Sequence, residues 1–225
     1  MTPSKPAPSL LDLPTPLLRQ LIRERVEAVG ERSDQDDDWR IGAVARDVRL
    51  ELRRYFPDAP TPAAVLVPIV DRGDSLTVLL TERASALRHH AGQISFPGGR
   101  IEATDGTAIE AALREAEEEI GLSREFVEVI GVLPDHMIVT GFRVTPIVAM
   151  VQPGFELRID PGEVASTFEM PLSFLLDPGN HVRRKRRFEN HEVELTDLPW
   201  GDRNIWGATA GMLFTLYRVL RGEDR

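Results

Sequence analysis

Within residues 113–122, LREAEEEIGL, four of the five positions from 115 to 119 are glutamate. They are Glu115, Glu117, Glu118 and Glu119, and this turn contains no lysine. Like charges at helical spacing repel one another, at a cost of roughly a few tenths of a kcal/mol per pair. Carboxylate oxygens without balancing cations are the ligands that Mg²⁺ or Mn²⁺ needs, with positions left for water and a substrate phosphate. The segment therefore indicates a divalent-cation site, and a solvated acidic helix is the alternative.

The element that must position these carboxylates is a helix predicted over residues 107–120. Thr107 and Glu110 match a capping box, and Gly121 suits the left-handed residue that ends a helix. Apolar residues spaced four, three and four apart form one buried face: Ile109, Leu113, Ala116 and Ile120. A different face collects three of the acids within one turn: Glu115, Glu118 and Glu119.

Residues 99–122 resemble the Nudix box. In that motif a glycine, five residues, a glutamate and seven residues precede R-E-U-x-E-E-x-G-U, where U is aliphatic. Here Gly99 opens the segment and residues 114–122, REAEEEIGL, close it. The acid after Gly99 and five residues is Asp105 rather than glutamate, and eight residues rather than seven separate it from Arg114. Asp105 is therefore a candidate additional acid whose role stays open.

The resemblance implies an enzyme that hydrolyses a nucleoside diphosphate linked to another moiety. Glu118 and Glu119 would be the principal ligands of Mg²⁺ or Mn²⁺, and Glu115 a further ligand or the group that orients the attacking water. Arg114 would hold the glutamates by ion pairing. Cations in such a site neutralise the diphosphate, position it and make bound water more acidic.

Residues 79–99, LLTERASALRHHAGQISFPGG, resemble the signature of the coenzyme A subgroup of this family. That signature reads L-(L/M)-T-x-R-(S/A), three residues, R, three residues, G, three residues and F-P-G-G, and every gap agrees. The resemblance implies hydrolysis of coenzyme A or its thioesters to (acyl-)4'-phosphopantetheine and adenosine 3',5'-bisphosphate. Arg83 and Arg88 would supply cations for the phosphates, unless they are structural ion pairs. Gly98 and Gly99 would let the backbone approach phosphate or metal closely.

Other residues near these motifs admit two interpretations. His89 and His90 could be acid–base groups, although a loop histidine is more often a surface residue. Phe96 and Pro97 could contact substrate or only shape the turn. Glu163 is a candidate additional metal ligand or base, and otherwise an exposed loop acid.

The basic run RRKRR at 183–187 also admits several interpretations. It could form a second phosphate patch or bind nucleic acid. It could equally be a basic edge strand that blocks pairing with neighbours.

Two other functions remain open at this stage. One is a Nudix hydrolase for a different nucleoside diphosphate derivative, such as ADP-ribose, NADH or a nucleoside triphosphate. The other is a non-catalytic Nudix module that binds a nucleotide. The intact acids and Arg114 argue against the second, because a pure binder does not need all of them.

Composition narrows the partners. Cysteine is absent, which excludes disulfides and thiolate metal sites, and the net charge of -9 makes nucleic acid an unlikely partner. The longest apolar runs, at 63–70 and 145–151, are far short of the ~18 residues of a membrane span. We expect a cytoplasmic enzyme of a small-molecule substrate, and a homodimer is an open alternative to a monomer.

The elements predicted from periodicity are strands mixed with a few helices. This mixture indicates an α+β fold in which a mixed β-sheet is sandwiched between α-helices. We expect an N-terminal helical extension over 1–60 and a Nudix hydrolase domain over 61–225. Helices are predicted at 15–29, 43–55, 107–120, 171–177 and 206–221, the last with Trp206 and Tyr217 on its apolar face. Strands are predicted at 63–71, 75–83, 127–133, 144–151, 154–159 and 191–197.

Overall fold

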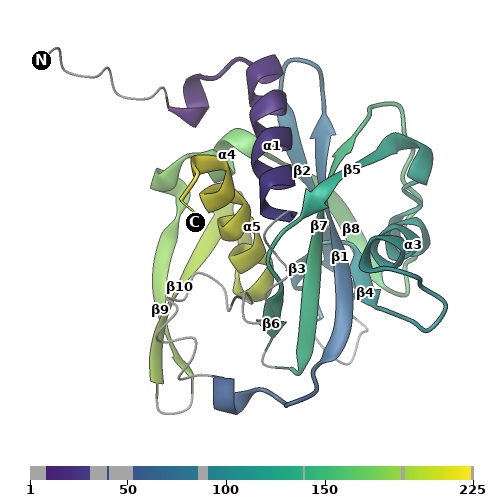
Figure 1. Cartoon of the computed structure of the whole chain (residues 1–225), viewed down its shortest axis with the longest axis vertical. Coiled ribbons are helices and arrows are strands. Elements are labelled where there is room, and N and C mark those ends of the chain that lie inside the picture. Colours follow the sequence, from purple (N-terminus) through teal and green to yellow (C-terminus); the bar gives the residue numbers. More distant parts are fainter. Residues whose placement is uncertain are drawn as a thin grey trace, which may run out of the picture.

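The structure is a computed structural model that describes residues 9–30, 40, 53–85, 91–138, 140–188 and 191–223 (Figure 1). Its helices are α1 (Thr15–Gly30), α3 (Ala108–Ile120), α4 (Leu172–Leu176) and α5 (Gly207–Arg221), with short 3-10 helices η1 (Leu10–Asp12), η2 (Arg53–Tyr55), η3 (Arg124–Phe126) and η4 (Pro178–Asn180). Its strands are β1 (Thr61–Asp71), β2 (Leu76–Arg83), β3 (Ile94–Ser95), β4 (Gly98–Arg100), β5 (Val127–Val132), β6 (His136–Ile138), β7 (Phe142–Val151), β8 (Val164–Pro171), β9 (Val182–Phe188), β10 (His191–Trp200) and β11 (Arg203–Ile205).

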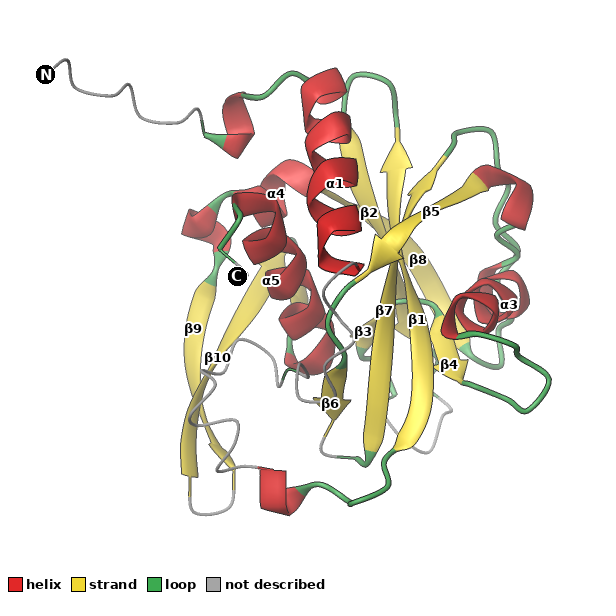
Figure 2. Ribbon diagram, viewed as in Figure 1, coloured by secondary structure: helices red, strands yellow, loops and turns green. Residues whose placement is uncertain are grey.

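Eight strands form one mixed sheet with the order β3-β2-β1-β7-β5 (Figure 2). In addition, β4 pairs with β1, β6 with β7, and β8 with β2. The central strands β1 and β7 are parallel, in a register that runs from Thr61 opposite Phe142 to Val70 opposite Val151. The remaining pairs in this sheet are antiparallel.

Helices cover both faces of this sheet, with α3 on one side and α1 and α5 on the other. Successive side chains of a strand point to opposite faces. In β1, Leu66 and Val70 therefore belong to the apolar cluster beneath α3, whereas Val67 and Ile69 belong to the cluster beneath α1 and α5. The predicted α+β fold with a mixed sheet between helices is confirmed.

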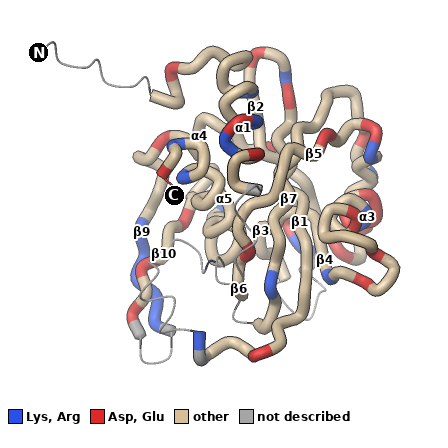
Figure 3. The backbone as a smooth tube through the Cα atoms, viewed as in Figure 1, with Lys and Arg blue, Asp and Glu red and all other residues tan. Residues whose placement is uncertain are grey.

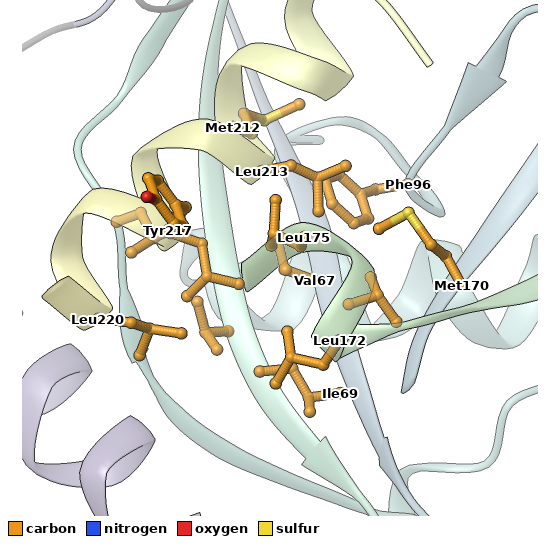
Figure 4. Close-up of a cluster of buried hydrophobic side chains, with 14 of the residues drawn as sticks. Val67, Ile69, Phe96, Met170, Leu172, Leu175, Met212, Leu213, Tyr217 and Leu220 are labelled. Atoms are coloured by element: carbon orange, nitrogen blue, oxygen red, sulfur yellow. The ribbon is translucent and has the colours of Figure 1, made fainter. Parts of the chain in front are cut away.

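The larger apolar cluster joins the sheet to α4 and α5 (Figure 4). Phe96, which immediately precedes the loop containing Pro97 and Gly98, is 2% exposed and belongs to this cluster. Pro97 is buried as well, and its carbonyl accepts a hydrogen bond from the backbone N–H of Leu66 at 2.9 Å. The core thus fixes the segment that leads into Gly98 and Gly99, which we call the glycine loop.

Helix α1 contributes to the same core. Leu18, Ile22 and Val26 are buried on the side of α1 that faces the sheet. An ion pair between Arg19 and Asp71, at 2.7 Å, joins α1 to the end of β1. Of the helix predicted over 43–55, only 53–55 falls within the described residues, where it forms η2.

Three predictions about the C-terminal half are resolved by the structure. Helix α4 and strand β10 form where they were expected. The strand predicted at 154–159 is wrong, because this segment forms no ladder within the described sheets. Alternating Phe155 and Leu157 gave it the pattern of a strand, but they pack as part of a loop against the cluster beneath α3.

The assignment of Trp206 to the buried face of the last helix is also wrong. Trp206 is the cap residue that precedes α5, its backbone is extended, and its side chain is 39% exposed. Tyr217, predicted for the same face, is 6% exposed and lies in the core. The first apolar residue of the pattern lies outside the helix, so helical periodicity does not apply to it.

Among the described residues, no helix has the length and apolar character that crossing a membrane would require.

Acid should destabilise the fold through His136. This side chain is 1% exposed, with Nδ1 3.2 Å from the Pro134 carbonyl and Nε2 3.4 Å from the Thr215 hydroxyl. Burial lowers its pKa to about 4, so between about pH 6.5 and 4 the unfolded chain binds more protons than the folded one. The stability that the neutral ring contributes is present above pH 6.5 and lost as the pH falls toward 4. We expect His136 to account for a loss of about 2 kcal/mol between pH 7 and 5.

Urea unfolding of the wild type and His136→Gln at both pH values measures this contribution. The pH dependence should be flatter in the variant, because glutamine does not titrate. Equal pH dependence in the two proteins would contradict the assignment.

Candidate active site

Helix α3 begins and ends where its caps require. The Thr107 hydroxyl accepts a hydrogen bond from the Glu110 backbone N–H at 3.1 Å, and Gly121 adopts the left-handed conformation with φ of 67°. The Glu110 carboxylate accepts from the backbone N–H of Gly106, at 2.7 Å, instead of from Thr107. The reciprocal half of the capping box is therefore displaced by one residue. These caps fix which residues form the last two turns, where the glutamates lie.

The glycine loop approaches two of these glutamates through its backbone. Gly98 and Gly99 lie on β4, which pairs with the first half of β1. The Gly98 N–H donates to Glu119 Oε2 at 3.1 Å. A Cβ placed on Gly99 would lie 2.5 Å from Glu115 Oε1. Only glycine at position 99 leaves room for the Glu115 carboxylate where it now lies.

Burial makes the ionised forms of these two acids unfavourable. Glu119 is 3% exposed, and burial raises its pKa to about 7; the Gly98 N–H and the charge of Arg83 oppose this, whereas the charges of Glu115 and Glu163 add to it. Burial also raises the pKa of Glu115, against the hydrogen bond from Arg114. The two acids therefore lack enough positive charge to compensate for their burial.

Arg114 lies at the centre of a second group of acids. Its Nε and Nη2 donate to the two oxygens of Asp105, at 3.0 and 2.9 Å. Its Nη1 donates to Glu115 Oε1 at 3.0 Å and to Glu118 Oε2 at 2.9 Å. The hydrogen bond from Arg114 lowers the pKa of Asp105. The two-point contact fixes the plane of the guanidinium, so Asp105 orients Arg114 and Arg114 in turn holds Glu115 and Glu118.

Other residues singled out by sequence approach the same region. Arg83, at the end of β2, places Nη1 3.8 Å from Glu119 Oε1. The Glu163 carbonyl accepts from the Ala84 N–H at 2.8 Å, and the Glu163 charge contributes to the raised pKa values of Glu115 and Glu119. Arg88, together with His89 and His90, lies outside the described residues.

Sequence reasoning missed the part that the segment before Glu163 plays. The backbone N–H of Arg158 donates to the Ile120 carbonyl at 2.8 Å, and that of Asp160 donates to the Glu119 carbonyl at 2.9 Å. These bonds satisfy carbonyls at the C-terminal end of α3 and fix the position of Glu119. The turn residues Asp160 and Gly162 were the available signal that a loop follows here.

The donor set fits a hard divalent cation, although the side chains do not form a complete site as they stand. Among the described residues, no three acidic or histidine side chains converge closely enough to hold a metal ion. Glu119 is buried and Glu115 is partly buried, the nearby arginines do not offset the effect of burial on their pKa values, and both offer only oxygen, which suits Mg²⁺ or Mn²⁺. Glu118 pairs with Arg114 through Oε2, and its side chain is 60% exposed to solvent.

The chain matches the NUDIX domain over residues 60–203 and therefore belongs to the Nudix family. The uncharacterized Nudix hydrolase NudL of Citrobacter koseri is 47% identical to it over 154 residues, which cover 67% of this chain and 78% of that protein. The protein of the same name from Escherichia coli strain K12 shows the same identity and coverage. The family assignment makes the chain a hydrolase of pyrophosphate bonds in nucleoside diphosphate derivatives, and such hydrolases generally use divalent metal ions.

Solved structures are similar to this chain at lower identity. The MutT protein of Methanosarcina mazei Go1 is 19% identical with a TM-score of 0.48, covering 75% of this chain and 99% of that one. DR0079 from Deinococcus radiodurans is 13% identical with a TM-score of 0.46, covering 72% of this chain and 88% of that one.

Replacing Gly99 by alanine should impair catalysis more than folding. The new Cβ would meet the Glu115 carboxylate, which is the end of a flexible side chain and can move aside. We expect kcat to fall by about 10²-fold, because misplacing a reacting group by about 1 Å has an effect of this size. The midpoint of urea unfolding should shift little. Hydrolysis rates and urea curves of the two proteins measure both quantities, and unchanged kcat would contradict the placement of Glu115.

Proposed function

We propose that this protein is a Mg²⁺- or Mn²⁺-dependent pyrophosphatase that acts on coenzyme A or its thioesters. The products would be 4'-phosphopantetheine, acylated or not, and adenosine 3',5'-bisphosphate. The observation that supports this most directly is the position of Arg83. It belongs to the stretch at 79–99 that resembles the coenzyme A signature, and it lies 3.8 Å from Glu119. The substrate-specific stretch and the general hydrolytic motif therefore meet at one place.

The roles of the acids follow from their surroundings. Glu115 and Glu119 would hold the cation from the buried side, and Glu118 would join them from the exposed side. When bound, the cation neutralises the diphosphate and makes coordinated water more acidic. Arg114 is a positioning residue in this scheme, because its hydrogen bonds go to acids of the site. Asp105 would orient Arg114 by accepting two hydrogen bonds from its guanidinium.

The cationic side chains would bind the substrate itself. Arg83 faces the site with its side chain 26% exposed, so it can contact a diphosphate oxygen next to Glu119. We assign Arg88 to the same task for the 3'-phosphate, on the basis of its place in the signature. Glu163 would serve as a further acid at the rim, either as a ligand or as the base that takes a proton from water.

A product assay tests the proposal. The protein is incubated with coenzyme A, dephospho-coenzyme A, ADP-ribose and NADH, in Mg²⁺, Mn²⁺ or EDTA. We expect metal-dependent release of adenosine 3',5'-bisphosphate from coenzyme A, and slower cleavage of dephospho-coenzyme A, which lacks the 3'-phosphate. Fast cleavage of ADP-ribose or NADH with little action on coenzyme A would overturn the substrate assignment while keeping the mechanism. Binding of these compounds without turnover would instead support a binding module.

A further inference from the structure

An open hollow of about 650 Å³ lies on the small sheet, away from the glutamates. The small sheet has the order β11-β10-β9, so in the described part of the chain β9 is one of its two edge strands. The hollow is lined by Arg184, Lys185, Arg186, Asp197, Pro199 and Asn204. The two regions lie on different sides of the molecule, and basic residues gather along β9 while acidic residues gather on α3 (Figure 3). The basic run at 183–187 is thus not part of the site described above.

Strand alternation sorts the charges of this hairpin onto two faces. Residues directly opposite in an antiparallel pair point to the same face. Lys185 lies opposite Glu194, and on this face Arg183 pairs with Glu194 at 3.3 Å and Lys185 with Glu192 at 2.6 Å. Glu192 and Glu194 of β10 are therefore directed away from Arg184 and Arg186.

On the other face, the buried carboxylate of Asp197 holds the guanidinium groups of Arg184 and Arg186. Asp197 is 0% exposed, and its Oδ2 is 3.1 Å from Arg184 Nε and 2.9 Å from Arg186 Nη2. Asn204 Nδ2 donates to the same oxygen at 3.2 Å. One negative charge beneath two positive charges leaves an excess of one positive charge at the surface. The buried acid also fixes two long side chains, which reduces the entropy that a ligand would otherwise lose on binding them.

An aromatic ring completes this arrangement. The guanidinium carbon of Arg186 lies 4.8 Å from the centroid of the Trp206 ring, and Trp206 is 39% exposed. Guanidinium groups match the geometry of phosphate oxygens, and exposed aromatic rings stack on nucleobases. A simple basic edge strand needs neither the buried acid nor the ring.

We propose that this hollow binds a small nucleotide through a phosphomonoester group. Arg184 and Arg186 would contact the phosphate, Asp197 would hold both arginines in place, and Trp206 would contact the base. Binding would need no divalent cation, because the positive charge is supplied by the chain. The site is independent of the proposed hydrolysis, so either can fail without the other.

Calorimetric titration with adenosine 5'-monophosphate in EDTA tests this site, in a Glu119→Gln background that removes turnover. Adenosine and inorganic phosphate are the comparison ligands. We expect adenosine monophosphate to bind more tightly than either, and Arg184→Gln to weaken it at least tenfold. Arg183→Gln removes the same charge from the neighbouring position on the opposite face, so it should change the dissociation constant less than twofold.

A second measurement follows the NMR signals of two side chains of the hollow directly. In the nitrogen–proton NMR spectrum of the Glu119→Gln protein, adenosine monophosphate should shift the Trp206 indole and Asn204 side-chain amide signals. The Trp206 signal is identified by its loss in Trp206→Phe. No shift of these signals, or equal weakening by the Arg183 and Arg184 substitutions, would overturn the proposal.

Discussion

Replacing Glu119 by glutamine should reduce kcat for the proposed substrate, coenzyme A, by about 10³-fold or more, which corresponds to about 4 kcal/mol of transition-state stabilisation. Glutamine keeps the size of the side chain but removes the negative charge that a divalent cation requires. Glu119 is 3% exposed and accepts a hydrogen bond from the Gly98 N–H, so water does not readily replace the lost carboxylate. The release of adenosine 3',5'-bisphosphate over time measures the effect.

Glu117→Gln is the matched control for this substitution. Glu117 lies in the same turn of α3 and carries the same charge, but its carboxylate pairs with Arg124 at 2.8 Å and is 38% exposed. We expect the control to keep kcat within about twofold, because exposed ion pairs contribute little. Equal losses in both variants would mean that the general charge of the helix matters rather than the position of Glu119, and would refute the site.

Replacing Gly98 by alanine should lower the free energy of unfolding by more than about 3 kcal/mol. The Gly98 φ of +152° is rare for residues with a Cβ. An added Cβ would lie 2.4 Å from the Ala64 carbonyl oxygen and 2.6 Å from the Val65 Cα. These are backbone atoms of the central strand β1, so they cannot move aside as the Glu115 side chain can. Urea unfolding followed by circular dichroism measures the loss.

Gly73→Ala separates backbone strain from the steric clash. Gly73 also has a positive φ, of +82°, but a Cβ there would meet nothing within 4 Å. We expect a loss of about 1 to 2 kcal/mol, which is the cost of a left-handed residue alone. If Gly98→Ala unfolded at the same urea concentration as Gly73→Ala, the close approach of β4 to β1 would be wrong.

Sequence was most informative where short-range chemistry determines the structure. Thr107 and Gly121 mark the ends of α3 because capping depends on a few adjacent residues. The spacing of Glu115, Glu118 and Glu119 placed them on one side of that helix for the same reason. The same spacing places Glu117 on a different side of the helix, and Glu117 pairs there with Arg124.

Sequence was least informative where a distant part of the chain determines the local structure. The alternation around Phe155 has the period of a strand, but a strand also needs a free neighbouring edge, which no local pattern reveals. The link between Asp105 and Arg114 depends on how the loop folds back, because one extra residue alters the family spacing. The role of Asp197 was present as a weak signal, since alternation aligns it with the apolar Val193 and Leu195. Its two arginine partners could be identified only from the hairpin register.

The parallel pairing of β1 with β7 has a consequence for the order in which the molecule assembles. Thr61 pairs with Phe142, so the connection between these strands contains both the Gly98 loop and all of α3. A nascent chain that has emerged only as far as Ile120 already contains Glu115, Glu118 and Glu119, yet it lacks β7, the parallel neighbour of β1. Such long-range pairing slows folding, and we expect refolding in milliseconds to seconds, measurable by stopped-flow tryptophan fluorescence. A refolding time in microseconds would contradict a folding rate limited by closure of this strand pair.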